Sequence, residues 1–269
     1  MFLNEAESTK NPFWMYLLGS LIIIFFSIIG QLPLTFFISG EKLLSAGGDP
    51  ILALRSLDKN LQLLLLLIPS LVGFSGLILV VYKLHEKSLK TISTSRKNFD
   101  WQRMFFAFFL WGLITVLLLI GDYLFNPSDY QWNFKLFPFV ILFIISITLI
   151  PIQASFEEYI FRGYLLHGFT SFFKKPWFSL VMTSIIFGCL HFSNPEVEKI
   201  GYSILIYYIG TGFFLGILTI IDGGIELALG FHIANNLLIS LLLTSSWTAF
   251  QTESIFLDIS EPSIGFEVI

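Results

Sequence analysis

Long apolar runs, each of about 20 residues, recur along this chain and constrain its fold more than any other feature. A helix of that length crosses a hydrocarbon core of roughly 30 Å, whereas a membrane strand alternates apolar and polar residues. The runs lack that alternation. The sequence therefore predicts an all-α, polytopic transmembrane bundle of about seven spans, with an eighth as the alternative. The seven runs cover residues 14–36, 61–84, 104–125, 136–155, 177–192, 201–221 and 225–243.

The composition agrees with a membrane protein and excludes other classes. Hydrophobic residues make up 55% of the chain and charged residues only 13%, against roughly a quarter in soluble domains. The net charge of −4, without a basic patch carrying interleaved aromatics, excludes nucleic acid as a partner. The single cysteine, Cys189, excludes a disulfide framework. The first run is longer than a signal-peptide core and no small-residue cleavage site follows it, so we expect a retained anchor.

The distribution of basic residues predicts the orientation. Six of the 15 lysines and arginines lie between residues 83 and 103, which should be cytoplasmic by the positive-inside rule. The N-terminus with Lys10 and the segment around Arg162 then lie inside as well, with ten basic residues inside and five outside. The tail after Gln251 carries acids such as Glu267 and no basic residue, which suits an external end. We predict a multi-pass integral membrane protein with a cytoplasmic N-terminus. In a bacterium, this membrane would be the inner membrane.

No internal repeat or linker rich in Pro, Gly or Ser divides the chain. We expect a single membrane domain over residues 1–269, with a motif-bearing core at 130–246 and an acidic tail at 247–269. The loop 39–60 contains the mildly amphipathic stretch "ILALRSL", which we expect to lie along the membrane interface.

The stretch "EEYIFR" places three charges beside an otherwise apolar run. Glu158 and Arg162 are spaced i, i+4 with the acid first, the favourable order for an ion pair on one helical face. Glu157 points about 100° away, so one arginine cannot serve both acids. This predicts one neutralised carboxylate and one available for proton transfer. The alternative, equally supported by this stretch alone, is a solvated helix end with a snorkelling arginine.

Two further segments carry polar side chains at helical spacing. "FGCLH" pairs Phe187 with His191, and "HIANN" pairs His232 with Asn236. Each has a structural alternative, because a histidine at a helix end is often a packing residue and buried amides commonly join membrane helices. Taken together, a carboxylate and an imidazole can activate water while an imidazole and an amide stabilise an oxyanion. No nucleophile motif such as G-x-S-x-G is present, so activated water is preferred.

The span boundaries create a geometric conflict. If the fourth run ends at Ser155 and the fifth crosses back to residue 192, His191 and Glu157 lie on opposite sides of the membrane. A shared site needs a long, tilted or re-entrant helix, and Pro151 or continuation through residues 159–173 offers one. We expect a polar intramembrane cavity, a funnel open to water in which these groups meet.

In order along the chain, these segments match the motifs EExxxR, FxxxH and HxxxN. The chain thereby resembles the CAAX protease and bacteriocin-processing family of intramembrane endopeptidases. This family includes the type II CAAX prenyl proteases and the abortive-infection-like proteins, and the resemblance covers about residues 149–240. It implies Glu157 as the base, Glu158 with Arg162 as a supporting ion pair and His191 as the imidazole partner. His232 and Asn236 would form an oxyanion or metal-side pair, with Phe187 near the site as a substrate-contacting or packing residue.

The resemblance also implies a metalloprotease, with zinc as the possible cofactor. Its ligands would be Glu157, His191 and His232, collected from separate helices because the chain has no HExxH. A metal-free mechanism using glutamate and histidine is equally open. The implied partners are the lipid bilayer and a membrane-associated peptide or protein substrate, prenylated or not. A non-catalytic immunity or scaffold protein and an ion-coupled transporter are the alternatives, although paired inverted repeats, usual in transporters, are missing.

Overall fold

The computed structural model describes residues 11–38 and 40–261, apart from the side chain of residue 51. Lys10, Glu267 and the end of the acidic tail lie outside the described residues. Five apolar helical segments of the described chain are long enough to cross a membrane, and two shorter apolar helices accompany them. The chain is thus an all-α helical bundle, as the sequence predicts. The long segments are Phe13–Phe37, Lys59–Leu84, Trp101–Phe125, Leu136–Phe173 and Ile204–Asp222.

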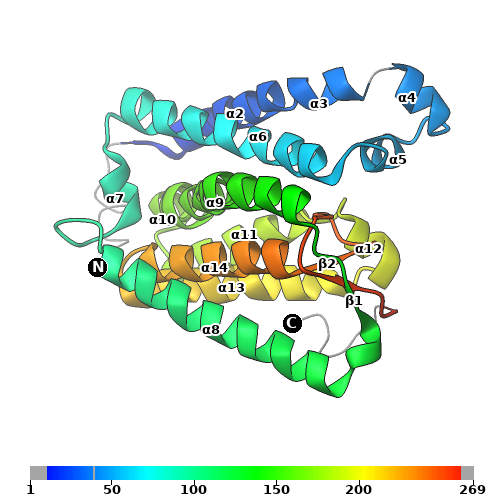
Figure 1. The fold of residues 1–269 in the computed structure, drawn as a ribbon. Helices are drawn as coiled ribbons and strands as arrows, with labels where there is room; N and C mark the ends of the chain where they lie inside the picture. The colour runs from blue at the N-terminus through cyan, green and yellow to red at the C-terminus, as the bar shows by residue number, and fades with distance from the viewer. Residues whose placement is uncertain (1–10, 39, 262–269) are drawn as a thin grey trace.

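The N-terminal third forms an antiparallel pair of helices along one side of the bundle (Figure 1). The pair consists of α2 (Phe13–Gly30) and α6 (Lys59–Leu79), and α6 continues as the π-helix η1 (Val80–Leu84). A Cβ on Gly30 would lie 2.6 Å from Cα of Pro69, so this crossing requires glycine. The short helices α3 (Leu32–Phe37), α4 (Gly40–Ser45) and α5 (Pro50–Arg55) connect the pair. The "ILALRSL" stretch lies mostly in α5, and its place at the interface stays a prediction.

The central helix is much longer than the fourth apolar run. It comprises α9 (Leu136–Glu158), the π-helix η3 (Tyr159–Leu165) and α10 (Leu166–Phe173), which together form one segment of 38 residues. The sequence-based end at Ser155 is therefore wrong, because the helix continues through both glutamates. The continuing helix places Glu158 and Arg162 one turn apart, and their ion pair of 2.8 Å offsets part of the cost of burying both charges.

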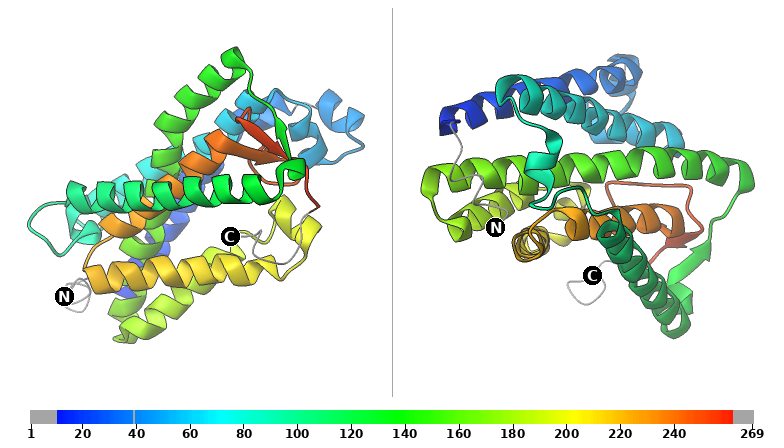
Figure 2. Two further views of the ribbon diagram at one scale, coloured as in Figure 1. Left: turned by 60° about the horizontal axis from the view of Figure 1, so that its bottom comes forward. Right: turned by 90° about the vertical axis from the view of Figure 1, so that its left-hand side faces the viewer.

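The second half of the chain packs around this central helix (Figure 2). α14 (Glu226–Leu242) lies between α9 and α8 (Trp101–Phe125), and α11 (Pro176–Cys189) packs against α13 (Ile204–Asp222). α11 ends at Cys189 rather than at residue 192, because residues 190–193 form a turn in which His191 N–H donates to Gly188 O (3.1 Å). The short helices α7 (Leu89–Ser93) and α12 (Pro195–Ile200) flank the bundle.

A small sheet covers the end of the bundle where α8 and α14 terminate. After η2 (Pro127–Asp129), β1 (Tyr130–Trp132) pairs antiparallel with β3 (Phe256–Asp258), which pairs parallel with β2 (Leu243–Ser245). The sequence analysis missed this sheet, because strands of three residues carry too little pattern to be recognised. Part of the acidic tail is thus folded onto the bundle. The opposite end holds the start of α2, where Asn11 contacts His85.

Candidate functional site

A buried ion pair forms the centre of the candidate site. Arg162 donates from Nη1 to Glu158 Oε1 over 2.8 Å, and from Nη2 to the carbonyl oxygen of Gly212 on α13 over 3.3 Å. His232 Nδ1 donates to the same Glu158 oxygen over 2.7 Å. All three side chains are buried, and Glu158 is fully enclosed. Glu158 therefore joins the central helix to α14 and, through Arg162, to α13.

Glu157 lies in a different environment. Its side chain is 24% exposed, and its Oε2 lies 3.7 Å from His232 Nε2. Its Oε1 accepts a hydrogen bond from Gln153, one helical turn earlier on α9. The two adjacent acids are thus separated as the helical geometry predicts: one is enclosed by an arginine and a histidine, and the other reaches a less buried surface.

Gln153 is a member of this cluster that the sequence analysis missed. Its Nε2 donates to Glu157, and its Oε1 accepts from Asn236 Nδ2 over 3.1 Å. The chain of contacts continues from Asn236 to Asn235 and then to Trp111 on α8. The available signal was a buried amide in an apolar run, four residues before Glu157 and therefore on the same helical face. Gln153 thus connects the HxxxN motif to the less buried acid.

The FxxxH motif reaches the cluster from α11. The guanidinium carbon of Arg162 lies 4.6 Å from the centroid of the Phe187 ring, and Phe187 also packs edge-on against Phe161. Phe187 is thus a packing partner of the central arginine. His191 stacks on Tyr208 at a centroid distance of 4.2 Å and lies 4.9 Å from Phe187.

His191 is the least connected of the expected site residues. Its Nδ1 pairs with the carbonyl oxygen of Phe187 over 2.9 Å, which orients the ring. Among the described residues it makes no hydrogen bond or ion pair with Glu157 or Glu158. The structure therefore brings Glu157, Glu158, Arg162, His232 and Asn236 into one polar cluster, and joins His191 to that cluster through the Phe187 ring.

The length of the central helix removes the conflict between the span boundaries. Because the helix continues to Phe173 before α11 returns along it, Phe187 on α11 reaches the level of Arg162. The long-helix solution is therefore the one this chain adopts. A water-filled funnel at this level stays a prediction. A cavity of about 180 Å³ lies near the sheet, beside Lys199, Trp247 and Asp258, and is lined by none of the cluster residues.

The side chains do not form the ligand set of a structural or catalytic zinc ion. Within the described chain, no three His, Cys, Asp or Glu side chains lie close enough together to hold a metal. His232 Nδ1 is bonded to Glu158, so His232 Nε2 and the Glu157 carboxylate are the two neighbouring groups of the cluster that could serve as metal ligands. Since a catalytic zinc site uses three protein ligands, the residues as arranged do not fit one.

Comparisons with known proteins find a family match in the part of the chain that carries the three motifs. Residues 135–238 match the family model described as "Type II CAAX prenyl endopeptidase Rce1-like". The chain is also similar to "Uncharacterized protein YyaK" of Bacillus subtilis (strain 168), at 28% identity over 249 residues, covering 90% of this chain and 82% of the relative. No solved structure matches. The matched segment contains the cluster and all three motifs, so this part of the membrane chain is similar to the Rce1-like CAAX-type endopeptidases.

Proposed function

We propose that this protein is an intramembrane endopeptidase that hydrolyses a peptide bond in a membrane-associated substrate, using water activated by Glu157. The observation that carries the proposal is the separation of the two adjacent acids. Glu158 is enclosed by Arg162 and His232, whereas Glu157 is partly exposed and faces His232 Nε2. Two carboxylates in such different environments are suited to different roles, one structural and one in proton transfer.

The proposed reaction needs only groups of the cluster and one water molecule. Glu157 removes a proton from water, and the water oxygen forms a bond to the carbonyl carbon of the scissile peptide. His232, as the imidazolium paired with Glu158, donates from Nε2 to the resulting oxyanion, together with the second Nδ2 hydrogen of Asn236. The C–N bond then breaks as Glu157 returns the proton to the leaving nitrogen. His191, the imidazole partner that the family resemblance implies, lies on the other side of Phe187 and has no part in these steps.

The substrate class follows from the location of the cluster. Glu157 lies within the long apolar segment Leu136–Phe173, so a substrate reaches it from a membrane-associated position. The Rce1-like match supports a peptide cleaved near its C-terminus, and lipid modification of that peptide is the open question. An immunity or scaffold role would not need a partly exposed acid beside an imidazole.

Purified protein in lipid nanodiscs tests the proposal. Two synthetic peptides of one sequence ending in a CAAX motif, one farnesylated and one not, are incubated with the parent and with Glu157→Gln, and products are identified by mass spectrometry. We expect cleavage by the parent and a loss of at least about 100-fold in Glu157→Gln. Activity should persist after exhaustive chelation. Equal cleavage by both proteins would contradict the assignment of Glu157, and zinc-dependent recovery after chelation would contradict the metal-free mechanism.

A further inference from the structure

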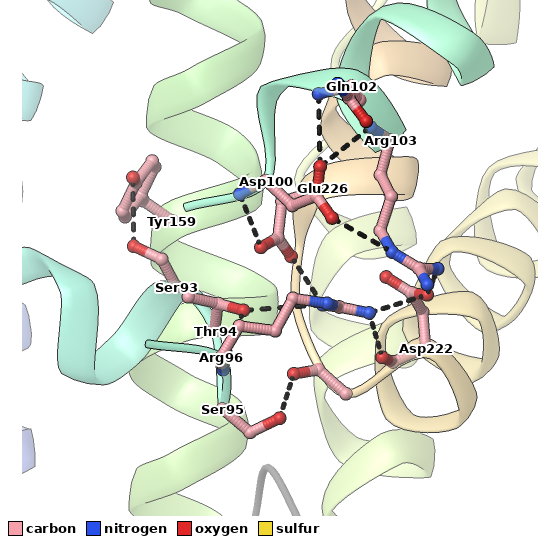
Figure 3. A network of polar contacts seen from close by, with 11 residues as sticks. Ser93, Thr94, Ser95, Arg96, Asp100, Gln102, Arg103, Tyr159, Asp222 and Glu226 are labelled. Carbon is pink, nitrogen blue, oxygen red and sulfur yellow. Dashed lines mark hydrogen bonds and ion pairs between the residues drawn. The ribbon is translucent and has the colours of Figure 1, made fainter. Parts of the chain in front are cut away.

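A second polar network, drawn in Figure 3, lies at the end of the bundle opposite the sheet (Figure 1). It joins residues 93–103, which run from the end of α7 into the first turn of α8, with residues 222–226, which run from the end of α13 to the start of α14. We call these contacts the clasp. Glu226 is fully buried in the clasp, with Oε2 at 3.3 Å from Arg96 Nη1 and Oε1 accepting from the backbone N–H of Asp100 over 3.2 Å. No motif of the proposed active site includes this acid.

Asp222, the last residue of α13, makes the second half of the clasp. Arg96 Nη2 donates to Asp222 Oδ1 over 2.9 Å and to its carbonyl oxygen over 2.7 Å. Arg103 Nη1 donates to the same carboxylate oxygen over 2.5 Å. Arg96 therefore binds the end of α13 and the start of α14 at the same time.

Backbone contacts lock the same two segments. Ile225 N–H donates to Ser93 O over 2.8 Å, and Ser95 N–H donates to Gly223 O over 2.9 Å. A Cβ on Gly224 would lie 2.0 Å from Glu226 Oε2, so the turn leaves no room for a side chain there. The clasp is thus closely fitted around the buried acid.

Each element held by the clasp also contributes to the active cluster. α13 supplies the Gly212 carbonyl to Arg162, and α14 supplies His232 to Glu158. Ser93 Oγ forms a hydrogen bond of 3.0 Å with the hydroxyl of Tyr159, the residue after Glu158. His232 lies six residues beyond Glu226, or about 9 Å along a stiff helix. A shift of the clasp would therefore move His232 relative to both acids.

We propose that Arg96 and Glu226 are positioning residues: the clasp sets the register of α14 on α9 and so places His232 beside Glu157 and Glu158. The catalytic part of this inference rests on the proposed function, whereas the register itself does not. A misplacement of about 1 Å in a catalytic group can cost on the order of 100-fold in rate, so a register device at this distance would be felt in catalysis.

The chain offers a reporter of register that is independent of activity. Ser146 on α9 and Ser240 on α14 are both buried, and their hydroxyl oxygens lie 3.4 Å apart. Cysteines at these positions, in a Cys189→Ser background, are close enough to form a disulfide under mild oxidation. The rate of disulfide formation measures how well α14 keeps its register on α9.

The test measures this rate in three clasp variants of graded severity, Arg96→Lys, Gly224→Ala and Glu226→Gln. The matched control is Lys199→Gln, which removes the Lys199–Glu261 ion pair near the sheet. We expect disulfide formation to slow by about tenfold in Glu226→Gln. Smaller decreases should follow in the two milder variants and none in the control. In the same variants without the added cysteines, kcat should fall while KM stays within about twofold.

The possible outcomes separate this inference from the proposed function. An unchanged rate in the folded fraction of all three clasp variants would overturn the positioning role, even if their thermal stability is lower. If the parent cleaves no peptide but the clasp variants slow disulfide formation, the register role stands and the proposed function fails. A fall in kcat without any change in disulfide formation also overturns the register role.

Discussion

His232 Nδ1 lies 2.7 Å from Glu158 Oε1, across 74 positions of the sequence. This contact orients the imidazole so that its other nitrogen, Nε2, faces Glu157 at 3.7 Å. One acid therefore holds the histidine, and the neighbouring acid faces its second nitrogen. The different environments of Glu157 and Glu158 depend on this contact as much as on the arginine.

The first prediction concerns stability after removal of each acid. Glu158→Gln should lower the free energy of unfolding by about 3–5 kcal/mol, because it leaves the buried Arg162 without its carboxylate. Glu157→Gln should change it little, because Glu157 is partly exposed and, among the described residues, forms no ion pair with Arg162. Thermal unfolding of both variants in one detergent measures the difference. Equal destabilisation by the two substitutions would show that the acids are not divided in this way.

The second prediction concerns Gln153, which connects Glu157 with Asn236. Gln153→Leu keeps the size of the side chain but removes both hydrogen bonds, so Glu157 and Asn236 lose their orientation. Since a hydrogen bond to a charged group is worth about 1.5–3 kcal/mol, we expect kcat to fall by about tenfold or more. The matched control is Gln62→Leu on α6, where the amide donates to Leu54 O instead. Both variants should lose stability, but only Gln153→Leu should lose activity per folded molecule.

The third prediction concerns the contact between α14 and α8. A Cβ on Gly230 would lie 2.0 Å from the carbonyl oxygen of Met104, and backbone cannot move aside as a side chain can. Gly230→Ala should therefore destabilise the protein by about 1–3 kcal/mol or more. Gly210→Ala on α13, where nothing lies within 4 Å of the added Cβ, serves as the control and should be neutral or slightly stabilising. A neutral Gly230→Ala would mean that α14 and α8 do not pack this closely.

The fourth prediction concerns His85, which follows the second long segment and lies beside the start of α2. Its Nδ1 accepts from Asn11 Nδ2 over 3.0 Å, and its Nε2 donates to the Tyr164 hydroxyl over 2.9 Å. These contacts suit a neutral imidazole. Burial, and to a smaller extent the nearby positive charge of Lys87, lower the pKa of His85 from 6.5 to about 4.

Because the folded-state pKa of His85 is below its unfolded value, protonation favours unfolding. The contribution of His85 to stability is complete above about pH 6.5 and decreases as the pH falls toward 4, by at most about 3 kcal/mol. His85→Gln retains hydrogen-bonding groups but cannot titrate. Unfolding measured from about pH 7 to about pH 4.5 should therefore show a smaller loss of stability in the variant than in the parent. Parallel curves for the two proteins would exclude this role for His85.

Local spacing in the sequence was sufficient for several features of the site. The i, i+4 relation of Glu158 and Arg162 predicted their ion pair, and the divergence of Glu157 followed from the helical angle. The apolar runs predicted the helical bundle for the same reason, because a helix satisfies its own backbone within one segment. The assignment of catalytic roles to these residues stays a prediction.

Contacts between distant segments were decided only by the tertiary structure. The central helix continues past Ser155, and it carries Glu158 to two partners, Arg162 on the same helix and His232 on another. Gln153 belongs to the cluster because Asn236, on another helix, packs against it. The strand at residues 256–258 is defined by its pairing with two strands from other parts of the chain. The sequence by itself thus determined what each helix can offer on its own surface, because that depends on residues within a turn or two. Which of these side chains contact one another across helices depends on how the helices pack, and no local pattern of the sequence encodes that packing.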